Sequence, residues 1–270
     1  MSVNEFSRTE LLIGEDNLKR LRDASVMVLG VGGVGSHCIE ALARSGVGRL
    51  ILVDNDTVSL TNINRQSIAF HSTVGQYKTL VMKERIKDIC PQTEVLTHEM
   101  FVLPENVDQL FGNGKEGRLD YIVDAIDTVT AKLILVEKAM EYQIPIISCM
   151  GTGNKLHAEL FEIVDISKTS VCPLCKVMRK ELRARGIEHL KVLYSKEKPI
   201  DVSTRVTGED KGSRRVLPGS VSFVPPVAGL LIAGEVVREL VSSPRYCEQS
   251  GITGEASGFI QGQEVCRKRE

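Results

Sequence analysis

A glycine-rich turn that follows an apolar run is the feature that most limits what this chain can fold into. Residues 25–31 (SVMVLGV) are almost entirely apolar, which predicts a strand buried on both faces of a parallel sheet. The run leads into a G-x-G-G-x-G pattern, whose glycines are Gly30, Gly32, Gly33 and Gly35. Glycines let a backbone approach a phosphate closely, and a helix N-terminus offers free N–H groups. The pattern predicts a nucleotide site, and a turn that only permits close packing is the alternative.

Strand and helix patterns alternate through the first half of the chain. Further strands are predicted at 50–54, 94–100, 120–127 and 145–150, and helices at 32–46, 75–90 and 128–142. Because short apolar runs alternate with helical segments, we predict an α/β fold with a Rossmann-like, doubly wound sheet that is parallel in this half.

The second half departs from this regular alternation, so its part of the sheet is expected to be mixed or antiparallel. The expected elements are strands at 157–166 and 189–194, helices at 173–186 and 226–240, and a loop at 208–219. We predict a single domain over 1–241, with a nucleotide-binding half at 1–150, a substrate-binding half at 151–241, and a flexible tail at 242–270.

Composition and targeting patterns indicate a cytoplasmic protein without a membrane span. The first 22 residues are polar and charged, which gives no secretory pattern. The apolar segment 221–234 has 14 residues, includes two prolines, and is shorter than the ~20 residues that a span needs. It is expected to be a buried helix, with membrane association as the alternative. The seven scattered cysteines fit a reducing compartment better than a disulfide framework.

A carboxylate and a group of cationic and amide side chains follow the glycine turn. Asp54 ends the second strand, 19 residues beyond Gly35, where a carboxylate can accept hydrogen bonds from ribose hydroxyls. Taken alone, this spacing is typical of an NAD-dependent dehydrogenase. Asn62, Arg65 and Lys78 follow, and hydride transfer needs none of them. A site that expels pyrophosphate does, because the charge of a triphosphate must be neutralised as the bond to the α-phosphorus breaks.

Asp127 ends the fourth strand, at the edge of the sheet where ligands bind in such folds. A single carboxylate there suits Mg²⁺, which usually keeps several waters and takes one or two carboxylates. Each charged residue also has a structural alternative. Lys78 could lie on a solvated helix face, Asp127 could cap the following helix, and Arg65 could be a surface charge.

The order of these motifs resembles the ubiquitin-activating-enzyme-like superfamily that includes ThiF, MoeB and HesA. The resemblance covers residues 8–240 and rests on G-x-G-G-x-G, Asp54, N-x-N-R-Q, V-G-x-x-K and D-A-I-D. It implies a ThiF/MoeB-type adenylating domain that uses ATP and Mg²⁺. Arg8 matches an arginine that reaches the ATP of a partner subunit, which implies a homodimer. The implied nucleotide-binding residues are Gly30, Gly32, Gly33, Gly35, Asp54 and Asn62, and the implied catalytic residues are Arg8, Arg65, Lys78 and Asp127, the last also being the metal residue.

Three segments resemble one branch of that superfamily, which modifies tRNA: R-T-E-L-L-I-G near the start, D-A-I-D-T, and G-S-V-S-F-V-P-P. This resemblance implies an ATP-dependent dehydratase that adenylates the threonyl carboxylate of threonylcarbamoyladenosine beside the anticodon and cyclises it, releasing AMP and pyrophosphate. It also leaves room for a cysteine desulfurase or sulfur-acceptor partner. The alternatives are an activator of a ubiquitin-like sulfur carrier, a non-catalytic nucleotide-binding module, and an NAD dehydrogenase.

The cysteine pattern departs from the carrier-activating relatives, which commonly hold zinc with two C-x-x-C pairs. Here Cys172 and Cys175 form one pair, and the later Cys247 and Cys266 are 19 residues apart. Structural zinc needs four ligands, so zinc is not predicted. The pair could be redox-active or simply begin a helix. Residues 212–222 contain no cysteine, which disfavours a thioester or persulfide mechanism.

Charge is distributed unevenly along the chain. The whole chain has net charge −1, yet residues 168–215 carry 13 Lys and Arg against 6 Asp and Glu, a net charge of +7. A basic segment beside an adenylation site fits a polyanionic substrate such as tRNA, although a solvated helix face with a basic loop would give the same pattern. The candidate tRNA-binding residues are Lys176, Arg179, Lys180, Arg183, Arg185, Lys191, Arg214 and Arg215.

Overall fold

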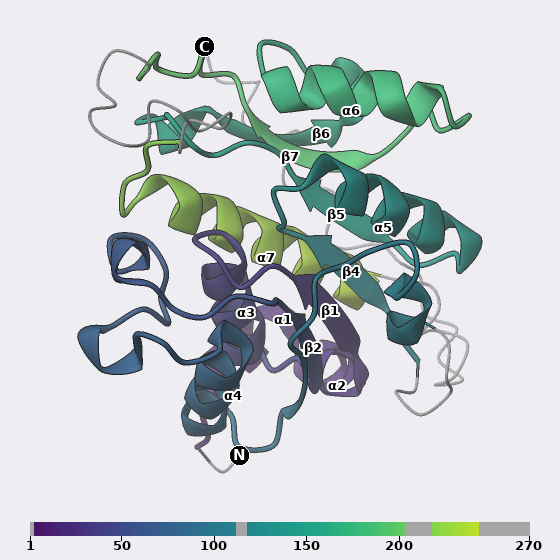
Figure 1. Cartoon of the computed structure of the whole chain (residues 1–270). Coiled ribbons are helices and arrows are strands. Elements are labelled where there is room, and N and C mark those ends of the chain that lie inside the picture. Colours follow the sequence, from purple (N-terminus) through teal and green to yellow (C-terminus); the bar gives the residue numbers. More distant parts are fainter. Residues whose placement is uncertain (1–2, 112–117, 203–217, 243–270) are drawn as a thin grey trace, which may run out of the picture.

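The computed structural model describes residues 3–111, 118–202 and 218–242, and its centre is a seven-stranded sheet (Figure 1). The strand order is β3-β2-β1-β4-β5-β7-β6, and every neighbouring pair is parallel except β6 with β7. The strands are β1 (Ser25–Leu29), β2 (Arg49–Val53), β3 (Glu94–His98), β4 (Tyr121–Asp124), β5 (Ile146–Cys149), β6 (Phe161–Asp165) and β7 (Lys191–Ser195). This arrangement confirms the predicted doubly wound sheet with a mixed second half.

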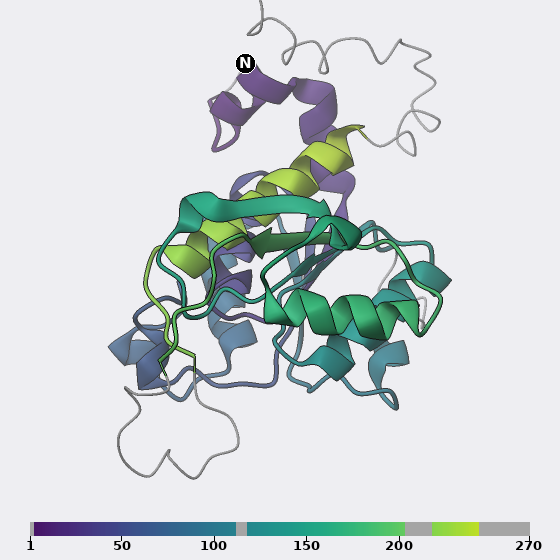
Figure 2. The same cartoon turned by 90° about the horizontal axis from the view of Figure 1, so that it is seen from above.

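Helices cover both faces of the sheet, with α7 on one side and α6 on the other (Figure 2). Alternate residues of the central strands enter separate cores. Val26 and Val28 of β1 pack with α3 and α7, whereas Met27 and Leu29 pack with α5. The longer helices are α3 (Gly35–Arg44), α4 (Lys78–Ile89), α5 (Val129–Glu141), α6 (Pro173–Arg183) and α7 (Val224–Ser242).

Two short helices, α1 (Ser7–Ile13) and α2 (Glu15–Asp23), precede the sheet. Leu18 and Leu21 anchor α2, whereas α1 buries none of its residues and leaves Leu11 and Leu12 exposed. Within the described residues, no helix is long and apolar enough to cross a membrane. The 3₁₀ turns are η1 (Leu60–Asn62), η2 (His71–Thr73), η3 (Val107–Leu110), η4 (Ala158–Leu160) and η5 (Ile166–Lys168).

The predicted bounds differ from the structure where local polar contacts replace the expected pairing. The strand expected at 157–166 is reduced to β6, because the Glu197 carboxylate accepts the amide hydrogens of Leu156 and His157, each at 3.0 Å, and η4 follows. The helix expected from residue 32 begins at Gly35, and the last helix begins two residues earlier than expected, at Val224. Most of the loop at 208–219 and the tail beyond Ser242 lie outside the described residues.

Candidate nucleotide-binding active site

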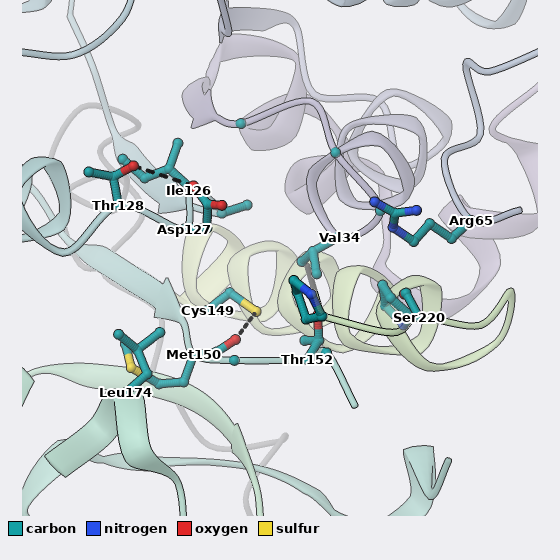
Figure 3. A pocket seen from close by; sticks show the side chains of 18 of the residues that line it. Val34, Arg65, Ile126, Asp127, Thr128, Cys149, Met150, Thr152, Leu174 and Ser220 are labelled. Atoms are coloured by element: carbon teal, nitrogen blue, oxygen red, sulfur yellow. Dashed lines mark hydrogen bonds between the residues drawn. The ribbon is translucent and has the colours of Figure 1, made fainter. Parts of the chain in front are cut away.

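A pocket of about 730 Å³ opens at the carboxyl edge of the sheet. Its centre lies at the end of β1, which pairs with β2 on one side and β4 on the other. Strand order reverses at this point, which is where open α/β sheets bind ligands. Arg65 and Asp127 reach into the pocket from opposite sides, and Met150 and Leu174 belong to a further wall (Figure 3).

The glycine turn forms one wall of the pocket. Gly30 has φ 91°, and a Cβ there would lie 2.7 Å from the Ala125 carbonyl oxygen, so a side chain would collide with the loop after β4. Gly35 is buried behind the turn and does not line the pocket; a Cβ there would lie 1.7 Å from the Gly30 carbonyl oxygen. Within the part of the chain that the structure describes, the amides of residues 32–34 donate to no protein acceptor. They form a phosphate-sized group of donors at the start of α3.

Asp54 and Asp56 line the pocket beside the glycine turn and hold the groups around them by hydrogen bonds. Asp54 Oδ2 accepts a 2.6 Å hydrogen bond from the Val31 amide, and its Oδ1 accepts a 2.8 Å bond from the Asp56 amide. Asp56 in turn holds Lys78, whose Nζ lies 2.7 Å from Asp56 Oδ2. The Lys78 side chain is only 7% exposed, so it is not the solvated helix residue that the sequence left open. Sequence reasoning missed Asp56, although it lies only two residues beyond the predicted Asp54.

Arg65 and Asn62 come from the segment that follows β2. Arg65 Nη1 donates to the Thr61 carbonyl at 2.9 Å and to Asn64 Oδ1 at 2.8 Å. Burial lowers the pKa of Arg65, but an arginine remains a cation at neutral pH. Asn62 lines the pocket, and its side chain also accepts the Ser59 amide hydrogen at 3.0 Å, which stabilises η1.

Gln66 is a pocket residue that sequence reasoning did not select. It lines the pocket, it is 7% exposed, and its Oε1 has no hydrogen-bond partner among the described residues. A buried amide oxygen that lacks a partner costs free energy, so a ligand that donates to it would be bound more tightly. Its place directly after Arg65 in the N-x-N-R-Q motif was the available signal.

Asp127 follows β4 and is exposed in the pocket. Thr128, and not Asp127, is the N-cap of α5, so the predicted capping alternative is not what the structure has. The Thr128 hydroxyl donates to Asp127 Oδ1 at 3.4 Å. A single accessible carboxylate fits Mg²⁺, which takes one or two carboxylates together with phosphate oxygens and waters. The described residues contain no group of three or more His, Cys, Asp or Glu that could hold a metal ion by themselves.

A buried ion pair supports the Asp127 loop from below. Lys132 Nζ lies 2.9 Å from Asp124 Oδ2 and 2.7 Å from the Cys149 carbonyl oxygen, and both side chains are 0% exposed. Ser148 Oγ donates to the same carboxylate at 2.5 Å, and the Ile126 amide lies 3.3 Å from Asp124 Oδ1. The network connects β4, β5 and α5, and through the Ile126 amide it also contacts the residue before Asp127. Asp124 is the first residue of the D-A-I-D motif, whereas Lys132 and Ser148 lie outside every motif that the sequence showed.

The opposite side of the pocket comes from the second half of the chain, at 151–155, 172–174 and 218–220. Lys155 is 3% exposed, and its Nζ donates to the Glu197 carbonyl at 2.6 Å. Burial lowers the pKa of Lys155, and the nearby Cys172 thiolate opposes that shift. Sequence reasoning also missed Lys155, which lies outside every motif and between two of the predicted strands.

The predicted tRNA-binding residues divide into two groups. Lys176, Lys180 and Arg183 are exposed along α6 and have no ionic partner within the described residues. The others are engaged: Arg179 donates to Thr169, Arg185 pairs with Glu137 and Glu181, and Lys191 pairs with Glu235 and Glu239. Arg214 and Arg215 lie outside the described residues.

Arg8 lies on the exposed helix α1 and does not line the pocket of its own subunit. The structure therefore separates this one predicted catalytic residue from the other three. The residues that it brings to the pocket are Gly30, Gly32, Gly33, Asp54, Asn62, Arg65, Lys78 and Asp127.

Comparisons with known proteins agree with this geometry. The model of the ThiF family matches residues 6–256. The chain is 47% identical over 246 residues to the tRNA threonylcarbamoyladenosine dehydratase of Bacillus subtilis (strain 168), covering 88% of this chain and 95% of that protein. Its fold superposes on the E. coli dehydratase TcdA in complex with ATP with a TM-score of 0.78 and 29% identity, covering 93% of this chain and 96% of the other. An AMP complex of the same E. coli protein gives a TM-score of 0.78 and 30% identity, covering 89% and 96%. The chain belongs to the ThiF family.

Proposed function

We propose that this chain is an ATP-dependent dehydratase whose substrate is a tRNA that carries threonylcarbamoyladenosine. The observation that carries the proposal is 47% identity to a dehydratase over 95% of that protein's length. The pocket supports it independently, because the glycine-turn amides and the side chains of Arg65, Lys78 and Asp127 line a space at the strand-order reversal. The E. coli relative binds ATP and AMP, a starting material and a product of the reaction that we propose.

The reaction would proceed in two steps. The threonyl carboxylate attacks the α-phosphorus of ATP, pyrophosphate leaves, and an acyl-adenylate forms. A nucleophilic atom of the same modified side chain then attacks the activated carbonyl, closes a ring and expels AMP, so that the nucleoside loses one water overall. Because ring closure is intramolecular, proximity supplies much of its rate and no enzyme thiol is required.

The pocket residues would divide this work by position. The amides of residues 32–34 would hold phosphate oxygens at the start of α3, and Asp54 would bind the ribose hydroxyls. Lys78, held by Asp56, and Arg65 would stabilise the charge that develops on the leaving pyrophosphate. Asp127 would hold Mg²⁺, whose chemistry when bound is to neutralise phosphate charge.

The substrate would approach from the second half of the chain. The α6 helix begins at the pocket with Pro173 and Leu174, and it carries the exposed cations Lys176, Lys180 and Arg183 along its length. A row of cations beside a pocket can bind the phosphates of a polyanion and so position its modified nucleoside in the pocket.

We also propose a homodimer in which Arg8 reaches the ATP of the partner subunit, and a cytoplasmic location where tRNA is available.

The test is mass spectrometry of tRNA nucleosides. Purified protein, ATP, Mg²⁺ and tRNA that carries the modification should yield a nucleoside lighter by one water, with one AMP and one pyrophosphate released per event. Unmodified tRNA is the matched substrate control and should release no AMP. If the nucleoside mass stays unchanged while a Gly-Gly-ending carrier protein stimulates ATP–pyrophosphate exchange, the carrier-activating alternative replaces this proposal.

A further inference from the structure

The second wall of the pocket contains a cysteine pair that the proposed reaction does not use. We propose that Cys172 and Cys175 form a reversible dithiol–disulfide site that reacts with small disulfides entering through the pocket. Cys172 lines the pocket at 4% exposure, and Cys175 lies behind it at 0%. A small disulfide is the fitting oxidant, because the sulfur of Cys172 is recessed and is reached through the pocket.

The backbone places the two sulfurs for bond formation. Cys172 is the N-cap of α6, Pro173 is its first residue, and Cys175 follows within the first turn. Helix geometry places Cα atoms three residues apart about 5 Å from each other, and a disulfide needs Cα atoms at about 4.4–6.8 Å. Both side chains belong to the same buried cluster, so the two sulfurs lie on one side of the helix start.

Local charge favours a thiolate at the outer position. The Cys175 thiol, followed by the backbone amides of Cys175, Gly151 and Leu174, lowers the pKa of Cys172 to about 5 despite its burial. The same interaction, together with burial, raises the pKa of Cys175, so one proton is shared with the inner sulfur. This is the division of roles that thiol–disulfide exchange needs, with a thiolate that lines the pocket as the nucleophile and a protonated resolving thiol behind it.

The backbone before Cys172 supports a special role for this turn. Val171 has φ 57°, which is rare for a β-branched residue, and the Cys172 amide donates to the Ser170 carbonyl at 2.5 Å. Strained backbone of this kind persists where the surroundings fix it, and it is enriched at functional sites.

Cys149 provides an internal contrast. It also lines the pocket, but its thiol donates to the Met150 carbonyl at 3.4 Å, and burial raises its pKa to about 12. Cys149 and Cys172 are equally buried, at 4% exposure each, so the two thiols differ in pKa and not in exposure. Zinc is not the occupant that the described residues favour, because no third ligand joins the pair there.

The exchange balances without another reactant. The Cys172 thiolate attacks one sulfur of a small disulfide RSSR, which forms a mixed disulfide and expels one thiolate RS⁻. Cys175 then loses its proton to that thiolate and attacks Cys172, so that the Cys172–Cys175 bond forms and the second R group leaves as a thiolate. The protein loses two electrons, and RSSR becomes two thiol equivalents.

The test uses the full chain in mixtures of reduced and oxidised glutathione, read by mass spectrometry of alkylated peptides. Wild-type protein should form a Cys172–Cys175 disulfide that dithiothreitol reverses. Cys175→Ser should stop at glutathione bound to Cys172, Cys172→Ser should form neither product, and Cys149→Ser should match wild type. At pH 7, iodoacetamide should label Cys172 about tenfold faster than Cys149.

Circular dichroism before each reaction establishes that every variant is folded. The proposal is overturned if folded wild-type protein forms no disulfide between these residues in fully oxidised glutathione. It is equally overturned if Cys172 pairs instead with Cys247 or Cys266, or if the purified protein holds zinc that is lost in Cys172→Ser.

Discussion

The buried pair Lys132–Asp124 gives the sharpest test of how this site is supported. In Lys132→Met, the Asp124 carboxylate stays fully buried and loses its ammonium partner at 2.9 Å, while it keeps the Ser148 hydroxyl and the Ile126 amide. Breaking a buried pair by removing one partner costs about 3–5 kcal/mol. For a protein of this size, 1 kcal/mol changes the thermal midpoint by about 2–4 °C, so we expect a fall of about 6–20 °C.

A matched control lies on the same helix. Lys138 of α5 also pairs with carboxylates, at 2.6 Å to Asp108 and 2.9 Å to Glu141, but both of those carboxylates are largely exposed. Solvent screens such pairs and ordering the side chains costs entropy, so Lys138→Met should leave the midpoint close to that of wild type. Calorimetry gives the thermal midpoints of the two variants and so compares the loss of a buried ion pair with the loss of an exposed one.

The double variant Lys132→Met with Asp124→Asn identifies the cause of the loss. It removes both charges and leaves a neutral amide that Ser148 can still bond, so it should be more stable than the sum of the two single losses predicts. Equal midpoints for Lys132→Met and Lys138→Met would refute the reasoning, as would losses that simply add in the double variant.

Three further predictions concern the pocket and α6. Lys78→Ala should lower kcat for AMP formation by about 10²–10³, because it removes a cation from the leaving pyrophosphate, and single-turnover assays with modified tRNA measure this. Gly30→Ala should lower the thermal midpoint and weaken ATP binding in calorimetry, because its Cβ would lie 2.7 Å from the Ala125 carbonyl oxygen. The exposed cations of α6 are Lys176, Lys180 and Arg183. Replacing them by alanine should weaken tRNA binding without changing ATP affinity. The slope of the logarithm of the binding constant against the logarithm of the salt concentration should fall by about one unit for each phosphate that is no longer neutralised.

The fold was predictable because its signals are local. The apolar run at 25–31 and the helical pattern at 75–90 depend on residues next to one another, and they correspond to β1 (Ser25–Leu29) and α4 (Lys78–Ile89). The strand expected at 157–166 was too long because a contact with a residue distant in the sequence ends the pairing. A glutamate 40 residues further along the chain accepts the amides that would otherwise pair in the sheet, and apolar periodicity carries no information about it.

The candidate site was predictable to the extent that its residues lie in contiguous motifs. Asp54, Arg65 and Asp127 were selected from such motifs, and all three line the pocket. Lys132 was not, because a lysine in the middle of a helix is usually solvated, and only the tertiary structure shows Asp124 at its end. Lys155 was missed similarly, since its partner is a backbone carbonyl 42 residues away. The roles of all these residues stay predictions until the variants are measured.

The predicted nucleotide-binding half at 1–150 and substrate-binding half at 151–241 share one hydrophobic core. Val224, Ala228 and Ile232 of α7 belong to the same core cluster as Val26 and Val28 of β1, so α7 covers the strand that leads into the glycine turn. Helix α7 also lies so close to the glycine turn that a Cβ on Gly229 would lie 2.3 Å from the carbonyl oxygen of Val34, the N-cap of α3. A nucleotide-binding half expressed alone would expose this apolar face at the base of its phosphate site. The half that we expect to bind tRNA therefore also packs against the turn that we expect to bind ATP.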